Sequence, residues 1–198
     1  MKKLHLFIRA FFELAEAKPI AKISVEELCN EVGVKRQTFY YHFNDMSDFV
    51  KAVMIDFTEH REDIDGDFTS DARFVADIYS TYSNAVKNIL NSPYASEVTD
   101  FLHDYLNKRS YHRVSSNPKY KNLPSEQLSS VSRIVAGILV SELSYWVKNN
   151  MQEDKEHLIE RFRVIFLNIE KMMVENALRD KIRKSNQLGS EIEKTNKH

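Results

Sequence analysis

The chain has 198 residues, 42% of them hydrophobic and 11% aromatic, which is enough to bury an apolar core and excludes a wholly disordered polypeptide. It holds only four glycines and four prolines, too few for the turns of a sheet protein, so we expect an all-α fold of long helices. The formal net charge of −1 excludes a uniformly basic surface, and any nucleic-acid-facing surface must be a local cluster of cations.

The N-terminal segment does not resemble a secretory signal, because His5, Arg9 and Glu13 interrupt it. The longest apolar run, residues 134–140, is far shorter than the ~20 residues that cross a bilayer. The single cysteine, Cys29, allows no intramolecular disulfide and no cysteine metal cluster. We therefore expect a cytoplasmic protein without membrane contact, cofactor or metal site.

Two helices are predicted in the first 33 residues. Apolar side chains at the spacing of one helical face predict a first helix that stops before Lys18 and Pro19; they are Leu4, Phe7, Ile8, Phe11 and Phe12. Ser24, followed three residues later by Glu27, forms a capping box that opens a second helix. Gly33 is placed to end that helix with a positive φ.

A short third helix is predicted over residues 35–42, and Asn44 and Asp45 offer caps for a fourth. Residues 33–43 contain two cations and His42 but no acid, whereas residues 45–77 contain ten acids. The acidic residues 59–67 are expected to form a solvated connection. Any DNA-facing surface is thus predicted to be confined to the N-terminal portion of the chain.

Residues 26–43 have the build of a helix-turn-helix, in which a short second helix enters the major groove of DNA. We expect four apolar side chains to hold the two helices together, namely Leu28, Val32, Val34 and Phe39. The predicted DNA-binding residues face outward and are Lys35, Arg36, Gln37, Thr38, Tyr40, Tyr41 and His42. One alternative is that these aromatic residues merely pack in a small helical domain. Another is a helical adaptor that uses the N-terminal bundle to contact other proteins.

At residues 23–28 (Ile-Ser-Val-Glu-Glu-Leu) and 33–43 (Gly-Val-Lys-Arg-Gln-Thr-Phe-Tyr-Tyr-His-Phe) the sequence resembles the TetR family of transcription regulators. The match covers about the first 55 residues. The resemblance implies an N-terminal three-helix DNA-binding domain, followed by a helical ligand-binding and dimerisation domain.

The resemblance also implies a role for each matching side chain. Arg36 and Gln37 are assigned to base edges, and the phosphate contacts are assigned to Thr38, Tyr40 and His42. The contacts of Lys35 and Tyr41 stay open. Family members often carry a phosphate-binding lysine just ahead of the fourth helix, where this chain has Met46, so that contact is either lost or made by the helix N-terminus.

The rest of the chain is predicted to be helical. We expect one helix over residues 75–90 and another from residue 92, then a mobile loop over 115–124. Two long helices follow, over residues 125–149 and 154–184. The sequence therefore divides into a DNA-binding domain (1–47), a regulatory and dimerisation domain (48–184) and a disordered tail (185–198).

The last predicted helix carries apolar residues at alternating spacings of four and three, which is typical of a helix that packs along another helix. This seam is formed by Leu158, Phe162, Ile165, Ile169 and Met172. The family resemblance implies that it belongs to a homodimer, which would place two recognition helices about one DNA turn apart. An intramolecular helix pair is the alternative.

An effector pocket is expected to combine apolar walls with a few polar groups. The candidate effector-binding residues are Tyr82, Phe101, Tyr105 and Trp146, although ordinary core packing explains each of them equally well. Residues 38–43 and 137–146 look similar to regulators of dihydroxyacetone kinase operons, in which a kinase-like protein can turn the regulator into an activator.

The sequence therefore predicts a homodimeric regulator, most simply a repressor, that binds double-stranded operator DNA and responds to a small-molecule effector. The alternatives are an activator controlled by a kinase-like protein partner, and an adaptor without DNA binding. An enzyme is not expected, since the sequence has no nucleophile beside a base, no glycine-rich phosphate loop and no metal-binding spacing.

Overall fold

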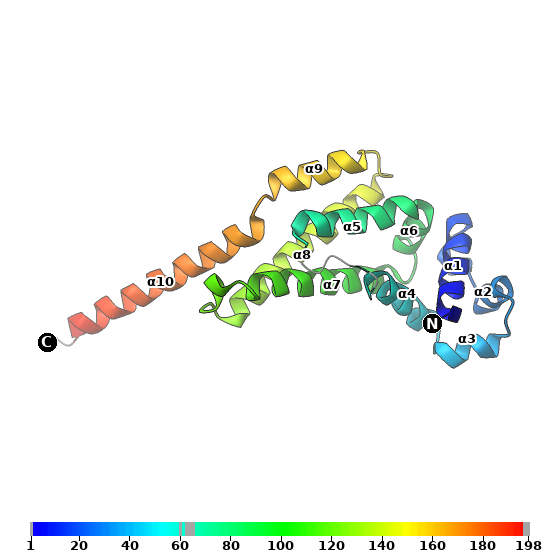
Figure 1. Ribbon diagram of the computed structural model, residues 1–198, viewed down its shortest axis with the longest axis horizontal. Coiled ribbons are helices and arrows are strands. Elements are labelled where there is room, and N and C mark those ends of the chain that lie inside the picture. The colour runs from blue at the N-terminus through cyan, green and yellow to red at the C-terminus, as the bar shows by residue number, and fades with distance from the viewer. Residues whose placement is uncertain (1, 60, 62–65, 196–198) are drawn as a thin grey trace.

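The computed structural model describes residues 2–59, 61 and 66–195, with side chains described from Leu4 to Gln187. All regular structure in this part of the chain is helical, which confirms the predicted all-α fold (Figure 1). None of the described helices is both long enough and apolar enough to cross a membrane.

Five helical segments build the N-terminal unit: α1 (Lys2–Ala17), the 3-10 turn η1 (Ile20–Lys22), α2 (Val25–Val32), α3 (Arg36–His42) and α4 (Met46–Glu59). As predicted, Ser24 Oγ accepts a hydrogen bond of 3.1 Å from the Glu27 N–H, and Gly33 ends α2 with a φ of 72°. The Glu27 carboxylate pairs with Lys18 Nζ, which ties α2 to the end of α1.

The remaining helices are α5 (Phe68–Thr81), α6 (Ser83–Leu90), α7 (Ala95–Ser115), the 3-10 turn η2 (Pro118–Tyr120), α8 (Ser125–Lys148), α9 (Lys155–Ile165) and α10 (Ile169–Thr195). The main pair is α7 against α8, while α9 packs on α5, and α10 packs on α8 and α7. The N-terminal helices α1–α3 lie at one end of the molecule, and α10 projects from the opposite end (Figure 1).

Two connections differ from the sequence prediction. The helix expected over residues 75–90 is interrupted at Tyr82, whose φ of −118° and ψ of 49° separate α5 from α6. The loop expected over 115–124 contains η2, and Tyr120 and Leu123 are buried, so their side chains anchor this segment to the core. The predicted connection 59–67 falls partly on residues 60 and 62–65, which lie outside the described residues.

The single helix expected over residues 154–184 is two helices. The chain turns at Asn168, which has a left-handed φ of 58°, and α10 then starts in a new direction. The prediction for the seam changes accordingly, because Leu158 and Phe162 are fully buried in the core of their own chain and cannot reach a second copy. Helix α10 continues to Thr195, through residues for which the sequence predicted disorder.

The N-terminal unit is joined to α6 by reciprocal capping. The Glu16 carboxylate of α1 accepts a 3.1 Å hydrogen bond from the Ala85 N–H in the first turn of α6. In return, Asn88 Nδ2 of α6 donates to the Ala15 and Lys18 carbonyls at the end of α1, at 2.7 and 3.2 Å. Each helix thus satisfies backbone groups that the other leaves open at its terminus.

The N-terminal hydrophobic core extends beyond the predicted domain boundary at residue 47. It includes Phe49, Val50 and Val53 of α4 together with Ala85 and Ile89 of α6. Helix α4 packs in the N-terminal core and also contacts α7, so it connects the helix-turn-helix with the C-terminal helices.

Candidate nucleic-acid interface

Helix α3 is held on the N-terminal core by aromatic side chains. Phe39 is fully buried, and its ring centroid lies 5.7 Å from Phe7, 5.7 Å from Phe49 and 5.1 Å from Phe43. Aromatic pairs prefer particular mutual orientations and contribute about 0.5–1.5 kcal/mol each beyond the burial of their area, so these contacts stabilise one orientation of the short helix. The inward-facing role predicted for Phe39 and Leu28 is consistent with their complete burial.

The opposite side of α3 is open. The predicted DNA-binding side chains at positions 35, 36, 37, 40, 41 and 42 are exposed, and Thr38 is half-buried at the rim. Tyr41 is 85% exposed and Tyr40 is 50% exposed, which is unusual for large aromatic side chains. The structure thus places six of the seven residues on α3 and Lys35 at its N-cap, and this short helix can enter the ~12 Å wide major groove.

Arg36 is already oriented on this surface. Its Nη1 lies 3.7 Å from Glu26 Oε2 of α2, and its pKa is raised first by a hydrogen bond with Tyr40 and further by Glu26. Both partners are solvent-exposed, so the Arg36–Glu26 ion pair is weak and the guanidinium can exchange it for a base edge.

The N-terminus of α4 is capped by carboxylates from its own first turn and the residue before it. Asp45 Oδ1 accepts a 2.8 Å hydrogen bond from the Asp48 N–H, and Asp48 Oδ2 accepts from the Asn44 N–H and Nδ2 at 2.9 and 3.0 Å. A phosphate at this helix N-terminus would meet two negative charges. Of the two outcomes that the sequence left open at Met46, the geometry favours loss of the phosphate contact.

A second contact joins the DNA-binding unit to α7. Ser47 Oγ, in the first turn of α4, donates a 2.8 Å hydrogen bond to Glu97 Oε1, in the first turn of α7. Tyr94 lies beside this pair, and its pKa is raised by burial and by the charges of Glu97 and Asp45. The Glu97 carboxylate thus lies in the first turn of α7 and is bonded to the first turn of α4, where helix dipoles favour negative charge, while its buried Oε2 has no hydrogen-bond partner among the described residues.

An apolar cavity of about 50 Å³ lies between the two units. Its walls come from α1, α4, α5, α6 and α7 and are Phe12, Met54, Phe57, Thr58, Phe74, Val75, Ile78, Tyr79, Val86, Ile89, Leu90, Val98 and Leu102. The Thr58 hydroxyl already donates to carbonyls of its own helix, at Ile55 and Met54. The cavity therefore offers an almost purely apolar lining.

The four candidate effector residues do not line this cavity. Tyr82 stacks on Phe12, with ring centroids 4.3 Å apart, at the edge of the site, and Tyr105 lies between Phe74 and Arg109. Trp146 is buried, and its indole N–H donates to the Glu153 carbonyl at 2.8 Å, which closes the turn between α8 and α9. Phe101 is half-buried on α7.

The sequence reasoning missed the contribution of α1 and α4 to the cavity. Apolar spacing predicts which face of a helix is buried, but it does not indicate a space left between helices, such as the one that Phe12, Met54 and Phe57 line. The chain turns at Tyr82 and α6 packs beside α1, and side chains of both helices line the cavity.

These features define a helix-turn-helix protein that binds DNA and regulates transcription. They are the buried aromatic side chains that hold α3, its exposed cationic face and the all-helical C-terminal unit. Two family models match: "Bacterial regulatory proteins, tetR family" over residues 7–53, and "Transcriptional regulator C-terminal region" over residues 73–168. The chain belongs to the TetR family of transcription regulators, whose members are regulators and not enzymes.

A solved structure described as "Dihydroxyacetone kinase operon activator DhaS" is similar in fold. The similarity has a TM-score of 0.66 at 16% sequence identity and covers 85% of this chain and 96% of that chain. No curated protein sequence matches the chain.

Proposed function

We propose that the chain is a sequence-specific regulator that binds operator DNA as a homodimer, with α3 of each copy in the major groove. The observation that carries the proposal is the exposed row of donors and aromatic side chains on α3, held rigidly by the buried Phe39. The test is selection of duplexes from a random-sequence pool by the purified protein. A dimeric regulator is expected to select two related half-sites about one helical turn apart.

Arg36 and Tyr40 are expected to contribute differently to this binding. Arg36→Ala should lower the preference for one base pair in each half-site by about tenfold, because a guanidinium can bridge two acceptors of guanine. Tyr40→Ala should weaken binding to all sequences alike, because a phosphate contact does not depend on the base.

The measurement is fluorescence anisotropy with the selected duplex, single-base variants and a scrambled duplex, each at two salt concentrations. Wild-type affinity should fall as salt rises, since phosphate contacts release counterions. An equal loss on every duplex for both variants would contradict the role assigned to Arg36.

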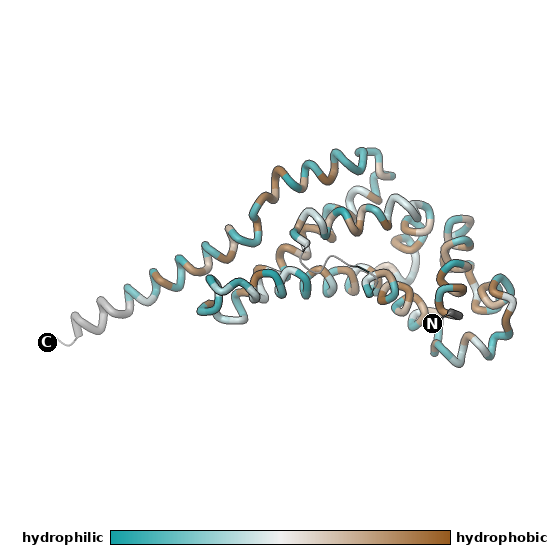
Figure 2. Tube along the Cα trace, viewed as in Figure 1, coloured by the Kyte–Doolittle hydropathy of each residue, from teal (hydrophilic) through white to brown (hydrophobic). Residues whose placement is uncertain are grey.

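The proposed dimer surface combines α10, the end of α9 and one face of α8. Ile165 and Met172 of the predicted seam are 61% and 54% exposed, and Leu167 lies between them in the chain, also exposed. On α8, Ile134 and Tyr145 are exposed as well. Apolar residues recur among hydrophilic ones along the projecting α10 (Figure 2). Within a single chain, part of this helix is not covered by other helices.

Met172→Lys is expected to weaken the dimer by at least about tenfold, because the new charge would be desolvated in the interface. Ile55→Lys is the matched control, since Ile55 is also an exposed apolar residue but lies on α4. Sedimentation velocity at micromolar concentration measures both variants. A wild-type protein that sediments as a monomer would contradict the proposed dimer.

We further propose that the regulator is a repressor controlled by a small apolar effector in the cavity between the two units. Drug-sized ligands need ~300 Å³ or more, so an effector would have to widen the cavity of about 50 Å³ and displace α4 or α6. The test measures operator affinity with a panel of small apolar compounds, together with transcription from a promoter that carries the selected site. Activation of that promoter would contradict repression.

The small cavity also favours a second candidate, an activator controlled by a protein partner. The similar solved structure is described as an activator of a dihydroxyacetone kinase operon, and a partner protein would need no internal cavity. The discriminating experiment adds a dihydroxyacetone-kinase-like protein from the same host to the promoter assay. Activation that requires this protein, with no effect of any compound, would favour the second candidate.

A further inference from the structure

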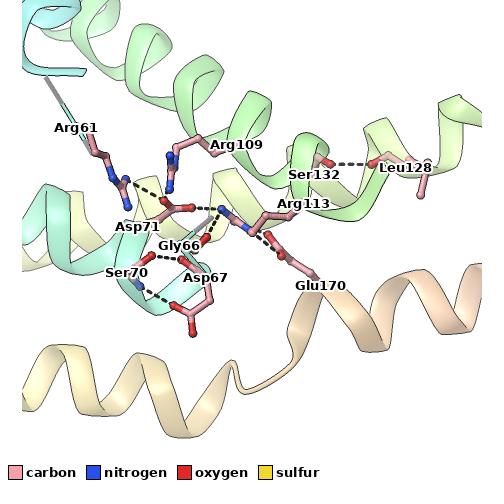
Figure 3. A network of polar contacts seen from close by, with 10 residues as sticks. All are labelled: Arg61, Gly66, Asp67, Ser70, Asp71, Arg109, Arg113, Leu128, Ser132 and Glu170. Carbon is pink, nitrogen blue, oxygen red and sulfur yellow. Dashed lines mark hydrogen bonds and ion pairs between the residues drawn. The ribbon is translucent and has the colours of Figure 1, made fainter. Parts of the chain in front are cut away.

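A network of charged side chains is buried where α5, α7 and α10 meet, and one of its members, Arg61, lies against Phe74 of the cavity wall. At its centre Asp71 of α5 is completely buried. Its Oδ1 lies 2.9 Å from Arg61 Nη1 and 2.6 Å from Arg109 Nε, and its Oδ2 lies 2.7 Å from Arg113 Nη1 (Figure 3).

Arg113 carries the network to α10. Its Nε and Nη2 donate to the two carboxylate oxygens of Glu170, at 3.1 and 2.6 Å, and its Nη1 also donates to the Gly66 carbonyl at 3.0 Å. Burial lowers the pKa of Arg113, but the hydrogen bonds and charges of Glu170 and Asp71 raise it overall, so the group stays charged. A bidentate guanidinium–carboxylate pair fixes the relative orientation of the two side chains as well as the distance between them.

Arg61 carries the network to α4. It follows the last residue of that helix, Glu59, by two positions, its side chain is only 3% exposed, and its guanidinium lies 4.4 Å from the centre of the Phe74 ring. At the other end of α4, Ser47 is held by Glu97, and α3 ends only four residues before α4 begins. Helix α4 is therefore linked to α7 at its start and to the network at its end, and only residues 43–45 separate its start from α3.

We propose that Asp71 is a positioning residue that locks α4 to α10 and thereby sets the distance between the two recognition helices of a dimer. This inference rests on the proposed function, in which α10 forms part of the dimer surface. The 14 residues of α4 make a lever about 21 Å long, so a tilt of about 3° at the network moves the start of α4 by about 1 Å. Because the half-sites of an operator have a fixed spacing, a shift of this size changes how well the two recognition helices of a dimer fit them.

The network suits this role because its members cannot be released one at a time. A buried charge that loses its partner is strongly unfavourable, so the arrangement tends to hold or to break as a whole. Glu170 lies near its rim, with a side chain 15% exposed, and is the arm that can be altered with least damage to the core.

The experiment compares Glu170→Gln with Glu175→Gln, a matched control on the same helix whose carboxylate pairs with Lys119 outside the network. Both variants are tested at concentrations where sedimentation shows them to be dimers. The probes are the duplex selected by the wild-type protein and two duplexes whose half-sites are one base pair closer or farther apart. Spacing preference is the readout, because a loss of stability alone would not change it.

We expect E170Q to lower the preference for the selected spacing by about threefold to tenfold and E175Q to leave it unchanged. Arg61→Lys keeps the charge but loses the planar fork, and it should lower the preference as well. The double variant should be no worse than the more impaired single variant, because both changes break one mechanical link.

Wild-type spacing preference in a dimeric E170Q would overturn the inference while leaving the proposed function intact. An E170Q protein that is monomeric at every concentration tested would also overturn it, because Glu170 would then serve assembly alone. A wild-type protein that selects no duplex would overturn the proposed function, and this inference with it.

Discussion

Phe39→Ala should lower the free energy of unfolding by about 3–5 kcal/mol and remove specific DNA binding, the largest effect expected in the DNA-binding unit. Phe39 is fully buried and contacts the rings of Phe7, Phe43 and Phe49, so truncation of its side chain leaves a cavity that these three rings border. Urea unfolding followed by circular dichroism, together with anisotropy on the selected duplex, measures the two effects.

Tyr41→Ala is the matched control for this prediction. Tyr41 lies two residues further along the same helix, but its side chain is 85% exposed. Its removal should leave the unfolding midpoint close to that of the wild type while weakening DNA binding. A Phe39→Ala protein as stable as Tyr41→Ala would show that the aromatic cluster does not hold α3.

Asp71→Asn should cost about 3–5 kcal/mol of the free energy of unfolding, because it removes the carboxylate charge that compensates three buried or nearly buried arginines. The amide keeps the size of the side chain, so the loss reports on charge and hydrogen bonding and not on volume. Urea unfolding of the purified variant at neutral pH measures it.

Asp77→Asn provides the comparison on the same helix. Asp77 pairs with Lys155 at 2.6 Å, but its side chain is 49% exposed, so water screens the pair and its loss should cost far less. Equal destabilisation by the two variants would contradict the compensating role of Asp71.

The local features of the DNA-binding unit were predictable from the sequence because neighbouring residues determine them. The Ser24 cap, the end of α2 at Gly33 and the buried position of Phe39 each follow from residues a few positions apart. The outward-facing residues of α3 follow from the same periodicity, and their individual contacts with DNA stay predictions.

The C-terminal helices were less predictable because tertiary contacts override periodicity there. The repeat of apolar residues from Leu158 to Met172 continues across the turn at Asn168, so the pattern alone indicates one helix where there are two. Asp71 gave one signal, an acid on the otherwise apolar face that includes Ala72 and Val75. Its arginine partners on α7 and after α4 could be identified only in three dimensions.

The reciprocal capping of α1 and α6 limits how this regulator can be engineered. Glu16 and Asn88 each complete a helix that belongs to the other unit. A hybrid protein that joins this DNA-binding unit to the ligand-binding domain of another regulator therefore has to include α6. A junction at residue 47 would expose the end of α1 and part of its apolar surface to water. The smallest transferable module is consequently larger than the helix-turn-helix.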